Sequence, residues 1–197
     1  MPTSYTPWSK LRRRMTMDTE DHTGRVGEYC SLLAGCIGLP EEKINSIRRQ
    51  SRLHDVGKIH IPVGILNKTG RLTAEEFALM KAHTVMGARI IGDHRRLALA
   101  RKLALYHHER WDGTGYPYGI RGEDIPIEAR ILSLADVYDA LRNLRPYKPA
   151  HDHETACGII LCGDGRTSPD HFDPRCLWAF RRMAGAFDDI HRRYSPA

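Results

Sequence analysis

Apolar residues in this chain recur at spacings of three and four, and no stretch of useful length alternates apolar with polar residues. Val26, Cys30, Leu33 and Ile37 form one such stripe. This spacing places side chains on one face of an α-helix, whereas a half-buried strand would alternate them. Similar stripes follow along most of the sequence, so we predict an all-α fold.

The breaks between these stripes set the expected helix boundaries. Thr73 and Glu76 form a capping box, which predicts a helix that begins there. Asp173 and Pro174 predict another start, as a cap and a first helical residue. Residues 111–126 hold four glycines and two prolines and predict a long loop. Helices are expected over residues 17–37 and 41–55, from 73, through 97–104, from 127, around 154–161 and from 174.

The length of 197 residues suits one domain with a sizeable core. Residues 1–16 carry a basic cluster without an apolar period, so we expect a tail or linker stub there and a domain over 17–197. No apolar run approaches the roughly 20 residues that cross a bilayer, and no membrane partner is expected. The five cysteines form no Cys-x-x-Cys pair, which disfavours a disulfide framework or a thiolate zinc site and favours a cytoplasmic location.

The net charge of +6 favours anionic partners. No helix-turn-helix, zinc-finger or RNA-binding signature accompanies this charge, so a nucleic-acid polymer is not the expected partner. An anionic small molecule accounts for the charge better.

Histidine and aspartate occupy positions where a plain helix would carry an apolar residue. A single inward histidine is most often a hydrogen-bonded core residue. Burying many imidazoles and carboxylates together is costly unless they pair or bind a cation. A metal cluster with nitrogen and oxygen ligands explains them, and such ligands suit Mn, Fe, Zn, Ni or Mg. The residues concerned are His22, His54, Asp55, His83, His107, His108 and Asp136.

Two motifs, together with residues 135–141, resemble the signature of the HD-GYP family, a branch of the HD-domain metal-dependent phosphohydrolases. The likeness covers roughly residues 17–185. It implies a bundle of about seven helices of the HD-domain type. It also implies hydrolysis of cyclic di-GMP to pGpG, with GMP as a further product left open, by a metal-bridging hydroxide that attacks phosphorus in line. The motifs are His54-Asp55-Val56-Gly57-Lys58 and His107-His108-Glu109-Arg110-Trp111-Asp112-Gly113-Thr114-Gly115-Tyr116-Pro117.

The same resemblance assigns the metal ligands. It implies two divalent ions, Fe or Mn first and Zn, Ni or Mg as alternatives, which Asp55 would bridge. A third ion is left open, because Asp18 stands where some family members carry a glutamate and is one methylene shorter. One ion would be held by His22, His54, Asp55 and Asp136, and the other by Asp55, His83, His107 and His108.

Substrate contacts also follow from the resemblance. Lys58 would contact phosphate and act with Asp55 in catalysis, and Arg145 and Lys148 match positions that contact the dinucleotide. Tyr116 either stacks on guanine or anchors the loop that carries it. Glu109 and Asp112 are expected to orient the paired histidines.

Alternatives of other classes stay open. The same cluster could act on another cyclic dinucleotide or another phosphate ester. A domain with little activity could bind cyclic di-GMP or dock a partner protein, although retention of every cluster residue favours an enzyme. A dimer or a signalling-protein partner is also left open.

Overall fold

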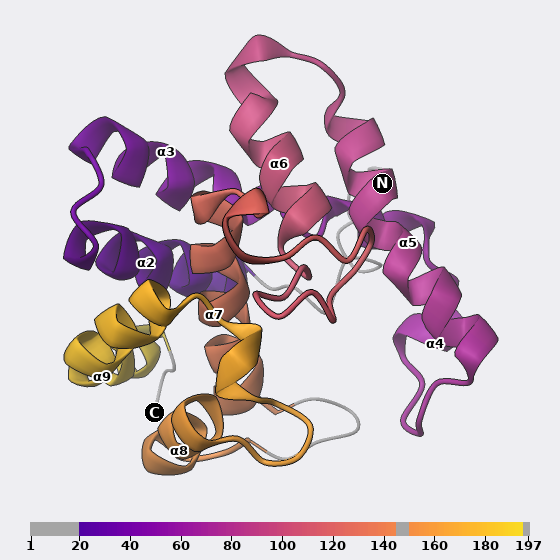
Figure 1. Cartoon of the computed structure of the whole chain (residues 1–197). Coiled ribbons are helices and arrows are strands. Elements are labelled where there is room, and N and C mark those ends of the chain that lie inside the picture. Colours follow the sequence, from indigo (N-terminus) through magenta and orange to yellow (C-terminus); the bar gives the residue numbers. More distant parts are fainter. Residues whose placement is uncertain (1–19, 145–149, 195–197) are drawn as a thin grey trace, which may run out of the picture.

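The computed structural model describes residues 20–144 and 150–194, and these residues contain no strand (Figure 1). The all-α prediction is confirmed. The described residues form eight α-helices where about seven were expected, and the additional one is the single turn α4. The tail at 1–16 and the candidate residues Asp18, Arg145 and Lys148 lie outside the described residues. The α-helices are α2 (Glu20–Cys36), α3 (Glu41–Gln50), α4 (Val63–Leu66), α5 (Ala74–Ile91), α6 (Ala98–Tyr106), α7 (Ile127–Arg142), α8 (His153–Cys162) and α9 (Pro174–Tyr194).

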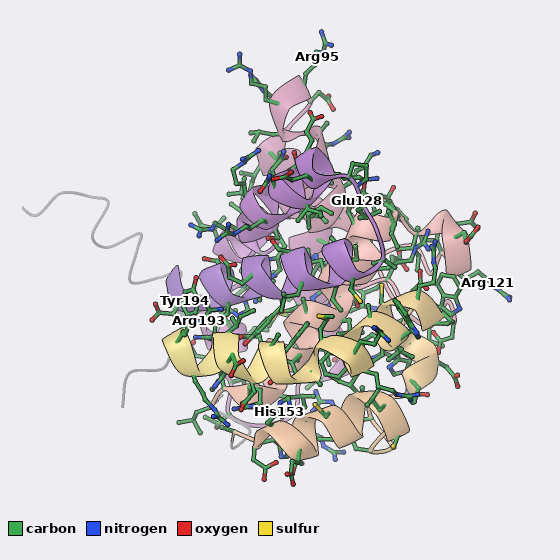
Figure 2. The ribbon with its side chains drawn as sticks, turned by 90° about the vertical axis from the view of Figure 1, so that its left-hand side faces the viewer. Arg95, Arg121, Glu128, His153, Arg193 and Tyr194 are labelled. Carbon is green, nitrogen blue, oxygen red and sulfur yellow. The ribbon has the colours of Figure 1, made fainter. Side chains whose placement is uncertain are left out.

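The hydrophobic core joins α2, α7 and α9. Tyr29 of α2 stacks on Phe187 of α9 with ring centroids 4.5 Å apart, and Tyr138 of α7 meets these two rings edge-on at 5.2 and 5.0 Å. Offset and edge-to-face arrangements are the favourable geometries for aromatic pairs. Figure 2 shows α9 lying between α2 and α8. This packing fixes α2 against α7, and both helices carry candidate site residues.

A second unit of the fold is formed by α5, α6 and the 3₁₀ turn η2 (Val56–His60), which packs on α5. A Cβ atom on Gly57 would overlap the carbonyl oxygen of His83 and lie 2.5 Å from the nitrogen of Gly87. Both are backbone atoms that cannot move aside, so only glycine fits at this contact. The chain therefore passes directly against α5 two residues after Asp55.

Gly57 was predicted to break a helix that runs to residue 55, and this is wrong. The α-helix α3 already ends at Gln50, and two 3₁₀ turns follow, η1 (Ser51–Leu53) and η2. The role of Gly57 is close packing of η2 on α5, which a helical period cannot reveal.

Capping residues in the sequence correctly predicted two other helix boundaries. Thr73 Oγ1 accepts a hydrogen bond from the backbone nitrogen of Glu76 (3.2 Å), and the Glu76 carboxylate accepts one from the nitrogen of Thr73 (2.8 Å). The Asp173 carboxylate accepts from the nitrogen of Arg175 (2.7 Å) at the start of α9. Both predicted helix starts are confirmed.

Ile90 follows Gly87 by three residues on α5, yet it is 45% exposed. The buried face of α5 is centred on Thr84 and Gly87, about a quarter turn away from Ile90. All five cysteines are free thiols, as predicted. Among the described residues, no helix has the length and apolar character that a membrane span requires.

Candidate metal centre

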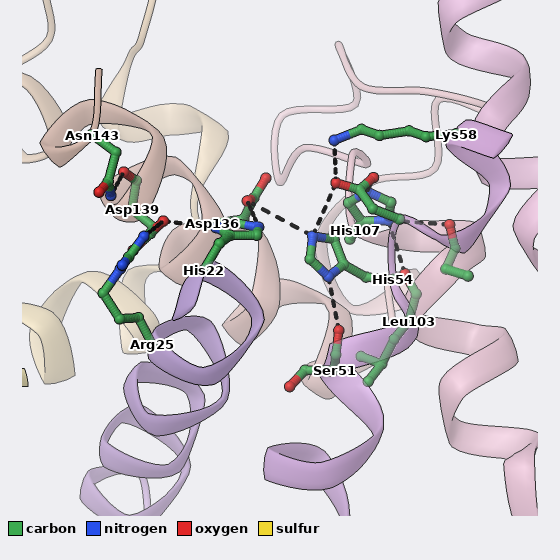
Figure 3. A network of polar contacts seen from close by, with 12 residues as sticks. His22, Arg25, Ser51, His54, Lys58, Leu103, His107, Asp136, Asp139 and Asn143 are labelled. Atoms are coloured by element: carbon green, nitrogen blue, oxygen red, sulfur yellow. Dashed lines mark hydrogen bonds and ion pairs between the residues drawn. The ribbon is translucent and has the colours of Figure 1, made fainter. Parts of the chain in front are cut away.

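The structure brings the seven predicted ligands together at the junction of α2, α5, α6 and α7. Figure 3 shows His22, His54, His107 and Asp136 among them. His22 lies on α2, His83 on α5 and Asp136 on α7, while the two adjacent pairs lie at the ends of η1 and α6. Within each of two groups, one ligand atom of every residue lies within 4.8 Å of the others. The first group is His22, His54 and Asp136, and the second is Asp55, His83, His107 and His108.

Asp55 stands between the two groups. Its Oδ2 atom lies 3.2 Å from His54 Nε2, on the side of the first group. Its Oδ1 atom lies 3.2 Å from His83 Nε2 and 3.5 Å from His107 Nε2, within the second group. The first group is completed by Asp136, whose Oδ1 atom lies 3.7 Å from His22 Nε2 and 3.8 Å from His54 Nε2. One carboxylate thus faces both groups with different oxygens.

Hydrogen bonds at the outer ring nitrogens orient the imidazoles. His54 Nδ1 donates to Ser51 O (2.8 Å), and His83 Nδ1 donates to Met80 O (2.7 Å). Nδ1 of His107 lies 3.0 and 3.1 Å from the carbonyl oxygens of Leu103 and Ala104. A carbonyl accepts only from a protonated nitrogen, so Nε2 of a neutral ring is left with its lone pair directed inward.

This arrangement fits a cation and is unfavourable without one. The Nε2 atoms of His83 and His107 are 3.4 Å apart, and both face the carboxylate oxygen of Asp55. Lone pairs and an anionic oxygen at such distances repel each other unless a positive charge lies between them. Imidazole and carboxylate ligands suit transition metals and Mg²⁺. The donor set therefore fits divalent cations at both groups.

The protonation states of the ligand side chains also favour metal binding. Burial acts to raise the pKa of Asp55, but the ammonium of Lys58 and the contacts with the imidazoles of His54 and His107 override it and hold that pKa well below its usual value. Burial lowers the pKa of His107, and burial with the neighbouring rings of His107 and His83 holds the pKa of His108 well below its usual value. Ionised carboxylate and neutral imidazole are the forms that bind metal.

Lys58 is in direct contact with Asp55, and its ammonium forms an ion pair with Oδ2. Its side chain is 20% exposed, against 7% for Asp55. Lys58 is therefore the more exposed partner of this ion pair.

Tyr116 lies against the second group. Its ring stacks on His108 with centroids 4.7 Å apart, and its backbone nitrogen donates to His108 O (3.1 Å). A Cβ on Gly115 would lie 2.5 Å from Glu109 Cα and 2.6 Å from His108 O, so the loop crosses directly under the paired histidines. This contact agrees with the anchoring role, and the stacking of guanine on Tyr116 stays a prediction.

Glu109 and Asp112 do not contact the rings that they were expected to orient. Glu109 is buried and accepts a hydrogen bond from the backbone nitrogen of Tyr118 (2.7 Å). Asp112 accepts from the nitrogen and the hydroxyl of Thr114 (2.9 and 2.7 Å). Both carboxylates shape the loop, because unpaired backbone nitrogens of a long turn need acceptors.

Two residues at the centre were missed by sequence reasoning. Asp139 Oδ2 accepts a hydrogen bond from His22 Nδ1 (2.7 Å), and Arg25 holds the same carboxylate through Nε (2.6 Å) and Nη2 (3.1 Å). Arg25 follows His22 by three residues, and Asp139 follows Asp136 by three. This one-turn spacing from two predicted ligands was a usable signal.

Comparison with known proteins agrees with this geometry. A model of the HD domain family matches residues 8–175. A cyclic di-GMP phosphodiesterase of Vibrio cholerae is 40% identical over 96% of this chain, and the response regulator RpfG of Xanthomonas campestris, a cyclic di-GMP phosphodiesterase, is 41% identical over 88%. The chain belongs to the HD-GYP branch of the HD-domain family.

The HD-GYP chain spans 41% and 45% of the length of these two relatives. A 3′3′-cGAMP-specific phosphodiesterase of Vibrio cholerae is 42% identical over 81% of the chain, which spans 30% of it. Among solved structures, Bd1817 from Bdellovibrio bacteriovorus, a HDG"Y"P protein, has a TM-score of 0.67 at 23% identity, over 90% of this chain and 54% of its own. The HD domain of Listeria monocytogenes PgpH, in complex with cyclic-di-AMP, has a TM-score of 0.61 at 18% identity, over 95% and 98%. These two structures share the fold.

Proposed function

We propose that this HD-GYP domain is a metal-dependent phosphodiesterase that hydrolyses cyclic di-GMP to pGpG, and can continue to GMP. The position of Asp55 is the observation that carries the proposal. Its two oxygens face two separate groups of ligands, at 3.2 Å from His54 on one side and 3.2 Å from His83 on the other. A shared carboxylate is what a pair of adjacent cations requires.

When bound, a pair of divalent cations would supply an activated water and neutralise charge on a phosphodiester, whose uncatalysed hydrolysis is extremely slow. His22, His54 and Asp136 would hold one ion and His83, His107 and His108 the other. Asp55 joins the two groups and fixes their separation. The ions are Fe or Mn by resemblance, and the third ion with Asp18 stays a prediction.

Lys58 would bind the scissile phosphate. Its ammonium pairs with Asp55 and its side chain is the more exposed of the two, so an anionic substrate that approaches the centre would meet this charge. A fixed cation beside the reacting phosphate stabilises the negative charge of the transition state. Arg145 and Lys148 would add contacts to the dinucleotide by resemblance, and Tyr116 would offer a ring face to a base beside His108.

A second substrate is 3′3′-cGAMP. Relatives at 40–42% identity include both cyclic di-GMP phosphodiesterases and a 3′3′-cGAMP-specific phosphodiesterase. The two substrates differ in one base and share the phosphodiester ring, so a centre that recognises phosphate suits both. A domain that only binds the dinucleotide is disfavoured, because the described ligands form two complete groups.

The test is product analysis with metal-loaded protein. Purified protein with Mn²⁺ or Fe²⁺ would be incubated with cyclic di-GMP, 3′3′-cGAMP and cyclic-di-AMP, and the products separated by chromatography. We expect cyclic di-GMP to be consumed fastest, with pGpG appearing before any GMP.

The control is Asp55→Asn, which keeps the size of the side chain but removes the charge that joins the two groups. We expect it to bind less metal and to lose activity at least about 100-fold. Preferred cleavage of 3′3′-cGAMP would assign the second substrate. If the protein bound the dinucleotide with both metal groups occupied and formed no product, the proposal would fail and the domain would be a binding module.

A further inference from the structure

Among the ligand imidazoles whose Nδ1 contacts the structure describes, His22 is oriented differently from the other three. His54, His83 and His107 donate to backbone carbonyls within one turn of their own position. His22, on α2, donates instead to the carboxylate of Asp139 on α7 (2.7 Å). The direction of this one ring therefore depends on how two helices pack, and on a side chain that is not itself among the ligand groups.

The Asp139 carboxylate is itself held in place. Arg25 binds it with two nitrogens, Nε at 2.6 Å and Nη2 at 3.1 Å, and both side chains are buried. The Asn143 side chain donates to the backbone carbonyl of Asp139 (2.7 Å) and secures the helix at this point. Figure 3 shows the resulting line from Arg25 through Asp139 and His22 to Asp136 and His54.

From this geometry we propose that Asp139, fixed by Arg25, is a positioning residue for the ion of the His22, His54 and Asp136 group, and not for the ion of the second group. The proposal rests on the metal centre of the proposed function, and on no particular substrate. Carboxylates that accept from the outer nitrogen of a ligating histidine typically strengthen metal binding about 10–100-fold.

The chemistry of the carboxylate explains why asparagine cannot replace it. Both oxygens of Asp139 accept, one from Arg25 Nε and the other from His22 Nδ1. Asparagine would turn its amide group either toward Arg25, where two donors would meet, or toward His22. In the second case His22 Nδ1 must accept, so the proton moves to Nε2 and that nitrogen can no longer bind metal.

The experiment compares Asp139→Asn with a matched control. Asp173 forms a similar buried ion pair with Arg130 (2.7 Å), in which its other oxygen caps α9, and neither residue is in a ligand group. Asp173→Asn thus reports the general effect of removing a buried charge. Co²⁺ would be titrated into metal-free wild type and both variants, with ion stoichiometry, calorimetry and visible absorption as readouts.

We expect wild type and Asp173→Asn to bind two ions with similar affinity. Asp139→Asn should keep one ion at wild-type affinity and bind the other about 10–100-fold more weakly. His22→Ala should weaken the same ion, and combining it with Asp139→Asn should add no further loss.

If Asp139→Asn does not fold, Arg25→Gln is compared with its control Arg130→Gln. We then expect only Arg25→Gln to bind that same ion more weakly. Identical two-ion titrations for Asp139→Asn and Asp173→Asn would overturn the proposal, as would equal weakening of both ions. These titrations contain no nucleotide. A protein that binds both ions and cleaves no cyclic dinucleotide would therefore refute the proposed function and leave this inference standing.

Discussion

At the scale of single residues, glycine matters here as much as the ligands do. Gly57 brings the backbone of η2 against the backbone of α5, and this contact sets the position of Asp55 relative to His83. Metal centres tolerate little displacement, since ligand geometry must be held to about half an ångström. The close contact therefore serves the centre as well as the core.

Gly57→Ala should destabilise the protein and disturb the centre together. The added methyl group would overlap the carbonyl oxygen of His83, and we expect a loss of about 3 kcal/mol in the free energy of unfolding, with weaker metal binding. The measurement is urea unfolding with a parallel metal titration. The control is Gly158→Ala in α8, where a Cβ meets nothing within 4 Å. Alanine there should raise the free energy of unfolding by about 0.5–1 kcal/mol. A fully stable Gly57→Ala protein would contradict the packing described here.

Lys58→Met should separate catalysis from metal binding. Lys58 holds the pKa of Asp55 down against burial, so without it that pKa rises and Asp55 takes up a proton at higher pH. Metal binding needs the ionised form, so the variant should bind metal normally at about pH 7.5 and lose it at a higher pH than wild type does on acidification. Activity should fall at every pH because the phosphate contact is gone. A metal titration at several pH values checks this, and an unchanged pH profile would count against the ion pair.

At the scale of elements, helix boundaries followed from local chemistry while contacts between elements did not. The capping box at Thr73 and Glu76 and the cap at Asp173 marked helix starts, because these side chains bond to backbone groups a few residues away. The 3₁₀ turns after Gln50 were missed, since η1 packs on α2 and α6 and η2 packs on α5, and these contacts join parts that are distant in the sequence.

For the candidate site too, the sequence predicted some residues and missed the contacts between distant parts of the chain. The sequence pattern identified all seven candidate ligands, and the family resemblance divided them between two ions, close to the two groups that the structure forms. Asp139 was missed although it follows Asp136 by one turn, because its partner Arg25 lies 114 residues away in the sequence. Glu109 was assigned to the histidines, yet it bonds to Tyr118, because sequence proximity to His108 does not fix the direction of a side chain.

Thr73→Ala should shorten α5 from its N-terminal end without affecting the centre. Loss of the cap leaves the nitrogen of Glu76 without its acceptor and should cost about 1 kcal/mol of stability. His83 lies more than two turns further along the helix, so metal binding should be unchanged. Thermal unfolding with a metal titration tests this, and Thr73→Ser should retain most of the stability. Loss of metal in Thr73→Ala would mean that the whole helix depends on its first turn.

At the scale of the whole molecule, the centre connects segments that lie far apart in the sequence. Ligands come from α2, α5, the end of α6, α7 and the turn between η1 and η2. Cations bound there would hold these segments together, and a ligand that binds only the folded state stabilises it.

Chelation should therefore lower the melting temperature, and added Mn²⁺ should restore it. Free metal at about 100 times its dissociation constant would contribute about 2.7 kcal/mol. Differential scanning calorimetry with and without EDTA measures the shift. Asp55→Asn provides the comparison, because a variant that binds little metal should show little response. An equal response of both proteins would place the stabilising metal elsewhere.

The carbonyl oxygens that fix His54, His83 and His107 belong to neighbouring turns of the chain itself. Donors held by their own backbone are already arranged when a metal arrives, and they adjust little to its radius. Nitrogen and oxygen donors of this kind accept several first-row metals, and affinity alone would favour zinc over iron or manganese. The ion found after purification should accordingly reflect the growth medium, so preparations from different media should differ in specific activity even when their folds are the same.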